Sequence, residues 1–248
     1  GSEFPFDGEA MAKRGVLLVT FNYRLGILGF FSHPELSAAS PTRTSGNYGL
    51  LDQLAALAWV RNNIAAFGGD PDRITVFGQS AGAMSVQTLL ASPLSRGMMA
   101  GAILQSGGGF FLHDRGLTLS KAEQDGQKLM KACGVDSVRA LRELPVEELF
   151  AGVRSLRKQS RGRAPAMGPV LDGHLIPQDP SKAILAGEVS RIPILAGSLA
   201  DEGNALGGSR DITLAMAAGS RVLTAVWPRI TGQPAWHYHF TRKAPGDD

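Results

Sequence analysis

The sequence predicts an α/β fold in which helices flank a doubly wound, mostly parallel β-sheet. Two observations predict this class. Short apolar runs that are typical of buried strands recur along the chain, at residues 16–21, 74–77, 100–104 and 192–196. Stretches with a helical pattern separate them, and alternation of this kind favours parallel strands joined by helices. With 248 residues, 44% hydrophobic and 19% charged, the chain has the composition and the length to bury a core.

The first quarter of the chain is predicted to run helix, strand, loop, helix. Glu9–Arg14 forms the last turns of a helix that Gly15 ends as a C-cap. Val16–Phe21 is a continuous apolar run, as expected for a strand buried on both faces of a parallel sheet. The polar stretch Ser32–Asn47 is expected to be a loop. Apolar residues then recur with a helical period over Leu50–Ile64.

A helical excursion is predicted at residues 117–165, between two strands of the sheet. Its sequence is amphipathic and charged, with breaks at Gly134 and Pro145. Such an excursion forms either a cap over a site or ordinary outer-layer helices, and the sequence does not choose between them. Pro165–Pro180, rich in Pro, Gly and Asp, is expected to be a loop. Residues 1–248 are predicted to belong to a single domain.

The strongest functional signal is the pentapeptide Gly78-Gln79-Ser80-Ala81-Gly82, which fits the G-x-S-x-G pattern of a nucleophile elbow. In such an elbow the serine lies on a strained strand-to-helix turn, and the glycines leave room for that turn. The helix that follows leaves the N–H of Ala81 free to bind a developing oxyanion. The pattern also occurs in ordinary turns, but here an apolar strand precedes it and helix-forming residues follow it. Ser80 is therefore the candidate nucleophile.

Two acidic residues follow the run at residues 192–196. Ligands and catalytic groups gather at the carboxyl ends of strands in sheets of this class. Asp201 and Glu202 lie shortly after such an end and are candidates for the acid of a catalytic triad.

Composition excludes several other classes. The net charge of +3 arises from 25 basic and 22 acidic residues. The densest basic run, Arg154–Arg163, contains no aromatic residue, so no nucleic-acid partner is expected. Cys133 is the only cysteine, which excludes an intrachain disulfide. No run is long enough to span a membrane, so the chain is expected to be soluble, whether cytoplasmic or secreted; its oligomeric state is left open.

Several motifs together resemble one known family. They are Phe21–Gly26, Gly46–Gln53, Asn63-Ile64, Phe67–Pro71, the elbow at 78–82, and Ile103–Gly107. In this order they are similar to the type-B carboxylesterase family, the cholinesterase-like branch of the α/β-hydrolases, whose bacterial members include para-nitrobenzyl esterases. The resemblance is collinear from about residue 1 to residue 206, and several ordered motifs are far more specific than one pattern.

The resemblance implies an α/β-hydrolase fold and a serine carboxylesterase that forms an acyl-enzyme on Ser80, with no cofactor or metal. The substrate would be a small-molecule ester. It implies that Ala81 is an oxyanion donor and that Glu202 is the triad acid, with Asp201 the weaker candidate. Ser106 matches a serine of the family whose hydroxyl can form a hydrogen bond to the acid, and its alternative is an ordinary strand-end cap.

The sequence also departs from the family pattern. The family's His-Gly-Gly-Gly oxyanion loop is expected just upstream of Gly1, and its catalytic histidine shortly after the strand that resembles Trp236–Thr241. A helical section that is longer in the family is reduced to residues 205–211. The chain is therefore expected to be an incomplete record of a larger hydrolase. On its own it is expected to be weakly active or inactive.

None of the five histidines is identified as the catalytic base. His237 and His239 alternate along the last predicted strand, which favours a core or surface role. His174 is expected to be structural or to line a pocket. His33 and His113 are expected in loops, and His113 could line the acyl pocket.

Other residues carry smaller predictions. Arg24 and Asp52 match a structural ion pair of the family. Gln79 precedes the nucleophile where the cholinesterase relatives have a glutamate, so a neutral or anionic ester is predicted to be a better substrate than a choline ester. Two alternatives stay open: a catalytically silent binding domain, which typically loses the nucleophile, and a lactonase or amidase on the same scaffold.

Overall fold

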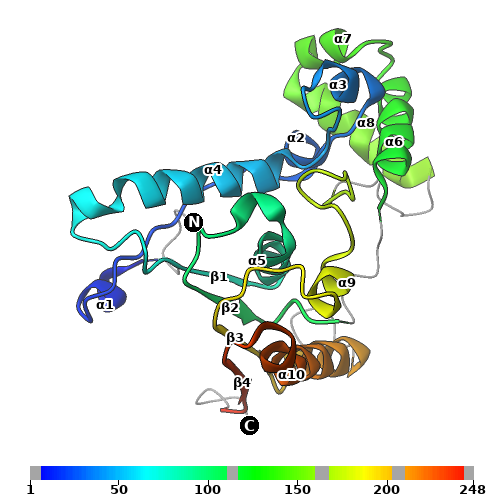
Figure 1. The fold of residues 1–248 in the computed structure, drawn as a ribbon. Helices are drawn as coiled ribbons and strands as arrows, with labels where there is room; N and C mark the ends of the chain where they lie inside the picture. Colours follow the sequence, from blue (N-terminus) through cyan, green and yellow to red (C-terminus); the bar gives the residue numbers. More distant parts are fainter. Residues whose placement is uncertain (1–6, 111–116, 160–167, 203–209, 243–248) are drawn as a thin grey trace. The chain divides into compact units, whose positions relative to one another are not determined.

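The structure is a computed structural model, and it describes residues 7–110, 117–159, 168–202 and 210–242 (Figure 1). Its contacts divide the chain into two compact units. Residues 1–56 and 116–177 form the first, here called the helical unit, and residues 57–115 and 178–248 form the second, here called the sheet unit. The single domain predicted from the sequence stays a prediction.

A four-stranded parallel sheet organises the sheet unit. Its strands lie in sequence order: β1 (Thr75–Gln79), β2 (Gly101–Gln105), β3 (Ile194–Leu199) and β4 (Ala235–Phe240). Parallel pairing requires a crossover connection that returns the chain to the end of the sheet where the previous strand began. Each of the three connections does this. The predicted strands at 74–77, 100–104 and 192–196 correspond to β1, β2 and β3, and β4 matches the expected strand near Trp236.

Three helices of this unit pack on the same side of the sheet: α5 (Ala81–Ala91), α9 (Pro180–Leu185) and α10 (Arg210–Thr231) (Figure 1). Their apolar residues meet a row of buried side chains that includes Leu104 and Ile194. Trp227 of α10 is fully buried, and its Nε1–H donates to the carbonyl oxygen of Ile192 at 2.9 Å. Two short 3-10 helices, η2 (Ile64–Phe67) and η3 (Pro93–Ser95), complete the unit.

The opposite face of the sheet carries apolar side chains in register across all four strands. Phe77, Ile103, Leu195 and Trp236 are neighbours in this row. Phe77 is 45% exposed and Trp236 is 56% exposed. In the part of the chain that the structure describes, this face of the sheet is therefore only partly covered.

The helical unit contains six helices wholly within the described residues and the start of a seventh. They are α1 (Glu9–Ala12), α2 (Gly26–Phe30), α3 (Pro34–Ala39), α6 (Leu119–Ala132), α7 (Val138–Glu143), α8 (Val146–Gln159) and the first half of α4 (Tyr48–Asn63). Apolar residues of α6, α7 and α8 form its core with Ile27 of α2. The predicted helical excursion is thus helical where the structure describes it, and its role as a cap stays a prediction.

The ion pair expected between Arg24 and Asp52 is present. The Arg24 side chain donates through Nε and Nη2 to the two Asp52 oxygens at 2.8 and 2.6 Å, and the Arg24 backbone N–H donates at 3.0 Å. These hydrogen bonds lower the pKa of Asp52, against the opposing effect of its partial burial. The Arg24 guanidinium also lies over the Tyr48 ring, 5.4 Å from its centroid.

Two local predictions differ from the structure. Val16–Phe21 is not a strand: it pairs with no strand among the described residues, and Val16 and Phe21 are 50% and 41% exposed. An apolar run becomes a strand only when a neighbour completes its ladder. The predicted loop at Ser32–Asn47 contains α3, because His33 caps the helix and Pro34 begins it. No prediction from the sequence covered the helix α10.

Candidate active site

Ser80 lies at the junction of β1 and α5, with φ 53° and ψ −119°. Non-glycine residues rarely adopt a positive φ, and holding one there costs about 1–3 kcal/mol. Among the described residues only Arg43, Ser80 and Ser106 do so. The strained strand-to-helix turn predicted for the pentapeptide is therefore present at Ser80.

The two glycines of the pentapeptide differ in their surroundings. A Cβ built on Gly78 would lie 2.5 Å from the carbonyl carbon of Gly82, so Gly78 cannot carry a side chain without moving the turn. A Cβ built on Gly82 meets no described atom within 4 Å. The steric requirement predicted from the sequence is correct at Gly78 and wrong at Gly82 within the part that the structure describes. The backbone of Gly82 is the obstacle that a side chain at position 78 would meet, so the close approach of the two backbones requires glycine at position 78.

Ala81 is the first residue of α5 and is exposed. The first N–H groups of a helix have no intrahelical acceptor, and they carry the positive end of the helix dipole. No described residue accepts a hydrogen bond from the Ala81 N–H. This donor is therefore available to an oxygen that becomes negatively charged beside Ser80.

Ser80, Ser106 and Glu202 follow three adjacent parallel strands, and so lie along one edge of the sheet. Ser80 and Ser106 come directly after β1 and β2, and Glu202 comes shortly after β3. The ladder continues past the strand ends, since Ser80 N–H donates to Gln105 O and Ser106 N–H to Gly197 O, both at 2.9 Å. Ser106 therefore lies between Ser80 and Glu202 along this edge of the sheet. Its hydroxyl makes no hydrogen bond to Glu202 in the described structure.

Glu202 is a buried carboxylate, 8% exposed. Its Oε1 accepts the backbone N–H of Leu199 at 2.7 Å, which holds the side chain against the end of β3. Burial and the charge of Glu202 together raise the pKa of Tyr238 on the neighbouring strand. Asp201, in contrast, is exposed. This difference agrees with Glu202 as the better placed of the two candidate acids.

The described histidines do not supply a base at this edge. His239 Nδ1 lies 3.3 Å from Ser198 Oγ, and His237 Nε2 lies 3.3 Å from Ser220 Oγ. Burial, Arg221 and His239 lower the pKa of His237. Neither ring is hydrogen-bonded to Ser80 or Glu202 in the described structure. The imidazole that a triad requires is thus not identified here.

The remaining histidines belong to the helical unit or lie outside the described residues. His174 is half-buried in a loop, and its N–H donates to Asp172 Oδ1 at 3.0 Å. The prediction for His113 falls on residues that the structure does not describe.

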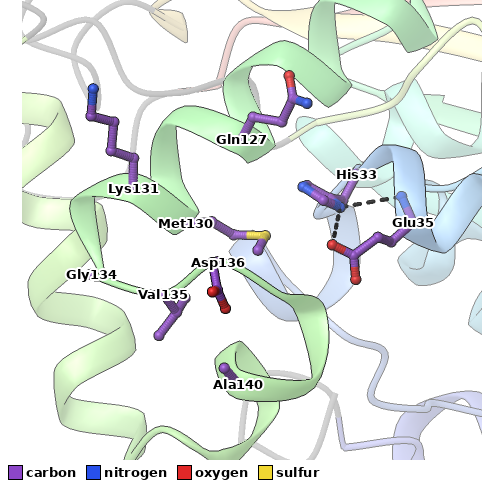
Figure 2. A pocket seen from close by; sticks show the side chains of 9 residues that line it. All are labelled: His33, Glu35, Gln127, Met130, Lys131, Gly134, Val135, Asp136 and Ala140. Carbon is purple, nitrogen blue, oxygen red and sulfur yellow. Dashed lines mark hydrogen bonds and ion pairs between the residues drawn. The ribbon is translucent and has the colours of Figure 1, made fainter.

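His33 borders an open pocket of about 660 Å³ in the helical unit (Figure 2). Its Nδ1 accepts the N–H of Glu35 at 3.3 Å, and Glu35 Oε2 accepts the N–H of Val138 at 3.1 Å. Each of these side chains therefore caps the start of a helix, α3 and α7 respectively. The polar groups on this side of the pocket have structural partners, and the pocket is not a second candidate site.

One part of the site was missed from the sequence. Gly107, Gly108 and Gly109 follow Ser106 directly and pack against the elbow and α5. Three consecutive glycines at the carboxyl end of a strand are the signal that could have revealed this loop, because they indicate close backbone approach.

The sequence of this chain is similar to those of known esterases. The sequence profile of the carboxylesterase family matches residues 1–214. The chain is 49% identical over 202 residues to the fumonisin B1 esterase of Sphingopyxis macrogoltabida, and 40% identical over 208 residues to the para-nitrobenzyl esterase of Bacillus subtilis (strain 168). These alignments cover 81% and 82% of this chain, and 36% and 41% of the two relatives.

Solved structures agree with the sequence relatives. A carboxylesterase of Geobacillus stearothermophilus, solved at pH 6.2, matches 100% of this chain and 60% of its own, with a TM-score of 0.82 and 31% identity. The chain belongs to the carboxylesterase family, and the predicted α/β-hydrolase fold is confirmed. It spans about two fifths of the length of the curated relatives described above.

Two further findings bear on the class of protein. Relatives occur in animals as well as in bacteria, so similarity does not assign a bacterial source. Within the described ranges, no helix is long and apolar enough to cross a bilayer, and no three His, Cys, Asp or Glu side chains are grouped to hold a metal ion.

Proposed function

We propose that the protein carrying this chain is a serine carboxylesterase that hydrolyses carboxylic esters through an acyl-enzyme on Ser80. The observation that carries the proposal is the strained elbow at Ser80, followed at the start of α5 by the N–H of Ala81, which donates to none of the described residues. Membership of the carboxylesterase family, and relatives named as esterases of fumonisin B1 and of para-nitrobenzyl esters, support it.

The reaction has two halves. Ser80 Oγ attacks the ester carbonyl carbon while its proton passes to a base, and the carbonyl oxygen gains a negative charge that the Ala81 N–H stabilises. The tetrahedral intermediate collapses, the bond to the alcohol oxygen breaks, and the alcohol leaves with that proton. Water then attacks the acyl carbon by the same route, which releases the acid and restores Ser80.

Glu202 is the proposed acid of the triad. A carboxylate in this role keeps the base in the correct tautomer and stabilises it once it is protonated. Burial at 8% exposure and the hydrogen bond from Leu199 N–H to Oε1 fix its position, and no donor to Oε2 is found among the described residues, which suits an acceptor for a ring N–H. The base is proposed to be a histidine outside the residues described, and Ser106 to support Glu202 from the neighbouring strand.

Covalent labelling tests the proposal. The full-length protein is exposed to a fluorescent organophosphate, which reacts with activated serines. Ser80→Ala is expected to abolish labelling, and Ser155→Ala, a control on the surface of α8, is expected to leave it unchanged. Labelling that persists in Ser80→Ala refutes the assignment. A folded wild type that is never labelled favours the catalytically silent binding domain instead.

The substrate class follows from Gln79 and is also a proposal. Gln79 ends β1 with an exposed side chain and contributes no negative charge beside Ser80. A choline ester needs aromatic faces or carboxylates around its cation. Neutral or anionic esters are therefore the proposed substrates. Assays on matched ester, lactone and amide panels distinguish the esterase from a lactonase or an amidase on the same scaffold.

A further inference from the structure

The loop that follows Ser106 is shaped by close backbone contacts on two sides. A Cβ on Gly107 would lie 2.4 Å from Ser80 O, and a Cβ on Gly109 would lie 2.4 Å from the carbonyl carbon of Gly219 in α10. Gly108 and Gly109 have φ angles of +78° and +90°, which side chains disfavour. The glycine loop, residues 107–109, thus lies directly against the nucleophile turn and cannot be displaced without disturbing it.

One side chain holds this loop. Gln87 of α5 is fully buried, and its amide pairs with both backbone groups of Gly109. Its Nε2–H donates to Gly109 O at 3.2 Å, and the Gly109 N–H donates to Gln87 Oε1. Two hydrogen bonds from a planar amide fix orientation as well as distance, as a pair in a β-ladder does.

The geometry explains why a glutamine is needed at this position. Buried backbone N–H and C=O groups must be paired, and Gly109 is buried. Gln87 lies two turns along the helix that Ser80 begins, so the helix that presents the nucleophile also fixes the loop beside it. The loop leads on to Phe110, which is half-buried at the same edge of the sheet.

We propose that Gln87 is a positioning residue that sets the wall of the ester-binding site formed by residues 107–110 beside Ser80. The inference rests on the proposed function, because it concerns the substrate that Ser80 would attack. Gln87 itself touches no reacting atom. It acts by fixing how the glycine loop lies against the nucleophile turn, and therefore where the chain that continues to Phe110 runs beside the ester that Ser80 would attack.

The two hydrogen bonds between the Gln87 amide and Gly109 are here called the clamp. Two near-isosteric variants of Gln87 test the clamp in the full-length protein. Gln87→Met removes both hydrogen bonds and leaves Gly109 unpaired. Gln87→Glu keeps the acceptor for Gly109 N–H but places a buried carboxylate against Gly109 O, which raises the pKa of the introduced acid. Below that pKa the protonated acid can replace the amide at both bonds. Above it, repulsion opens the loop.

The readout is substrate selectivity, not activity alone. The ratio of kcat/KM for long and short esters is measured in two series, p-nitrophenyl esters that vary the acyl chain and butyrate esters that vary the alcohol. Gln87→Met is expected to change the ratio roughly five- to tenfold in at least one series, as the loss of one or two buried hydrogen bonds implies. In Gln87→Glu the ratio should equal that of wild type at low pH and depart from it as the pH rises. A ratio cancels any titration of the catalytic base.

Thr88→Val provides the matched control. Thr88 is a buried neighbour on the same helix, and its Oγ1 donates to Met84 O at 2.9 Å within α5, away from the loop. It should lower thermal stability without changing either ratio. Unchanged ratios in both Gln87 variants, with Ser80 still labelled by the organophosphate, overturn the positioning role. Wild type that is not labelled at Ser80 instead contradicts the proposed function on which the inference rests.

Discussion

Gly78 and Gly82 make a matched pair for testing the elbow, because the same substitution has opposite consequences at the two positions. A Cβ on Gly78 would lie 2.5 Å from the carbonyl carbon of Gly82 and 2.6 Å from its oxygen. That is nearly 1 Å short of the 3.4 Å at which ordinary contact begins. The obstacle is backbone, which cannot turn aside as a flexible side chain can. A Cβ on Gly82 meets no described atom within 4 Å.

The magnitudes follow from these distances. Forcing an extra methyl group into a closely packed site costs about 1–3 kcal/mol, and Gly78→Ala should lower the free energy of unfolding by that amount. A reacting group displaced by about 1 Å loses roughly a hundredfold in rate. Organophosphate labelling of Ser80 should slow accordingly. Gly82→Ala should be neutral or should stabilise by up to about 1 kcal/mol, because alanine favours the helix over glycine.

The assay compares chemical unfolding and labelling rates of both variants with those of wild type, in the full-length protein. Equal destabilisation by the two alanines would mean that the contact at Gly78 does not govern the elbow. A Gly78→Ala variant with normal stability and normal labelling would refute the steric argument outright.

Three further predictions concern charge, burial and the substrate. Arg24 lowers the pKa of Asp52 in the folded protein, so Asp52→Asn should lower the free energy of unfolding at any pH above the unfolded-state pKa of about 3.9. The difference in unfolding free energy between variant and wild type should shrink as the pH falls through the lower folded-state pKa. Chemical unfolding of both proteins at pH 7 and pH 3 measures this difference. Trp227→Phe should cost roughly 1–3 kcal/mol, since it leaves Ile192 O without its buried donor, and unchanged thermal stability would contradict this. With Gln79 before the nucleophile, p-nitrophenyl butyrate should be hydrolysed with a higher kcat/KM than acetylthiocholine, and the reverse order would sink the substrate proposal.

Much of the sheet unit could be predicted because local sequence and tertiary environment agree there. The strands β1 to β3 are short apolar runs bounded by turn residues, and the predicted helix at Leu50–Ile64 is α4 within two residues at its start. Val16–Phe21 has the same local character as those strands, but a strand also needs a neighbouring ladder, and no sequence pattern reports whether that neighbour is present.

The site was predicted less evenly. The nucleophile turn and Glu202 are encoded locally, by the glycine-serine pattern and by an acid after a strand. The clamp between Gln87 and Gly109 joins residues 22 positions apart, and the packing of Gly109 on Gly219 joins segments far more distant. Such contacts depend on where each helix lies on the sheet, and the periodicity of hydrophobic residues does not specify that position. The helix α10 was not predicted either, and it contains Pro228, a residue that favours a break.

The two hydrogen bonds that extend the ladder past the strand ends link Ser80 to Gln105, and Ser106 to Gly197. Each strand terminus thereby takes its position from the strand beside it, across gaps of about 25 and 90 residues in the chain. Fraying of β3 would release Ser106 first and the nucleophile turn next. The reactivity of Ser80 consequently reports on the integrity of the sheet, and during unfolding it should be lost no later than the far-ultraviolet signal of the strands.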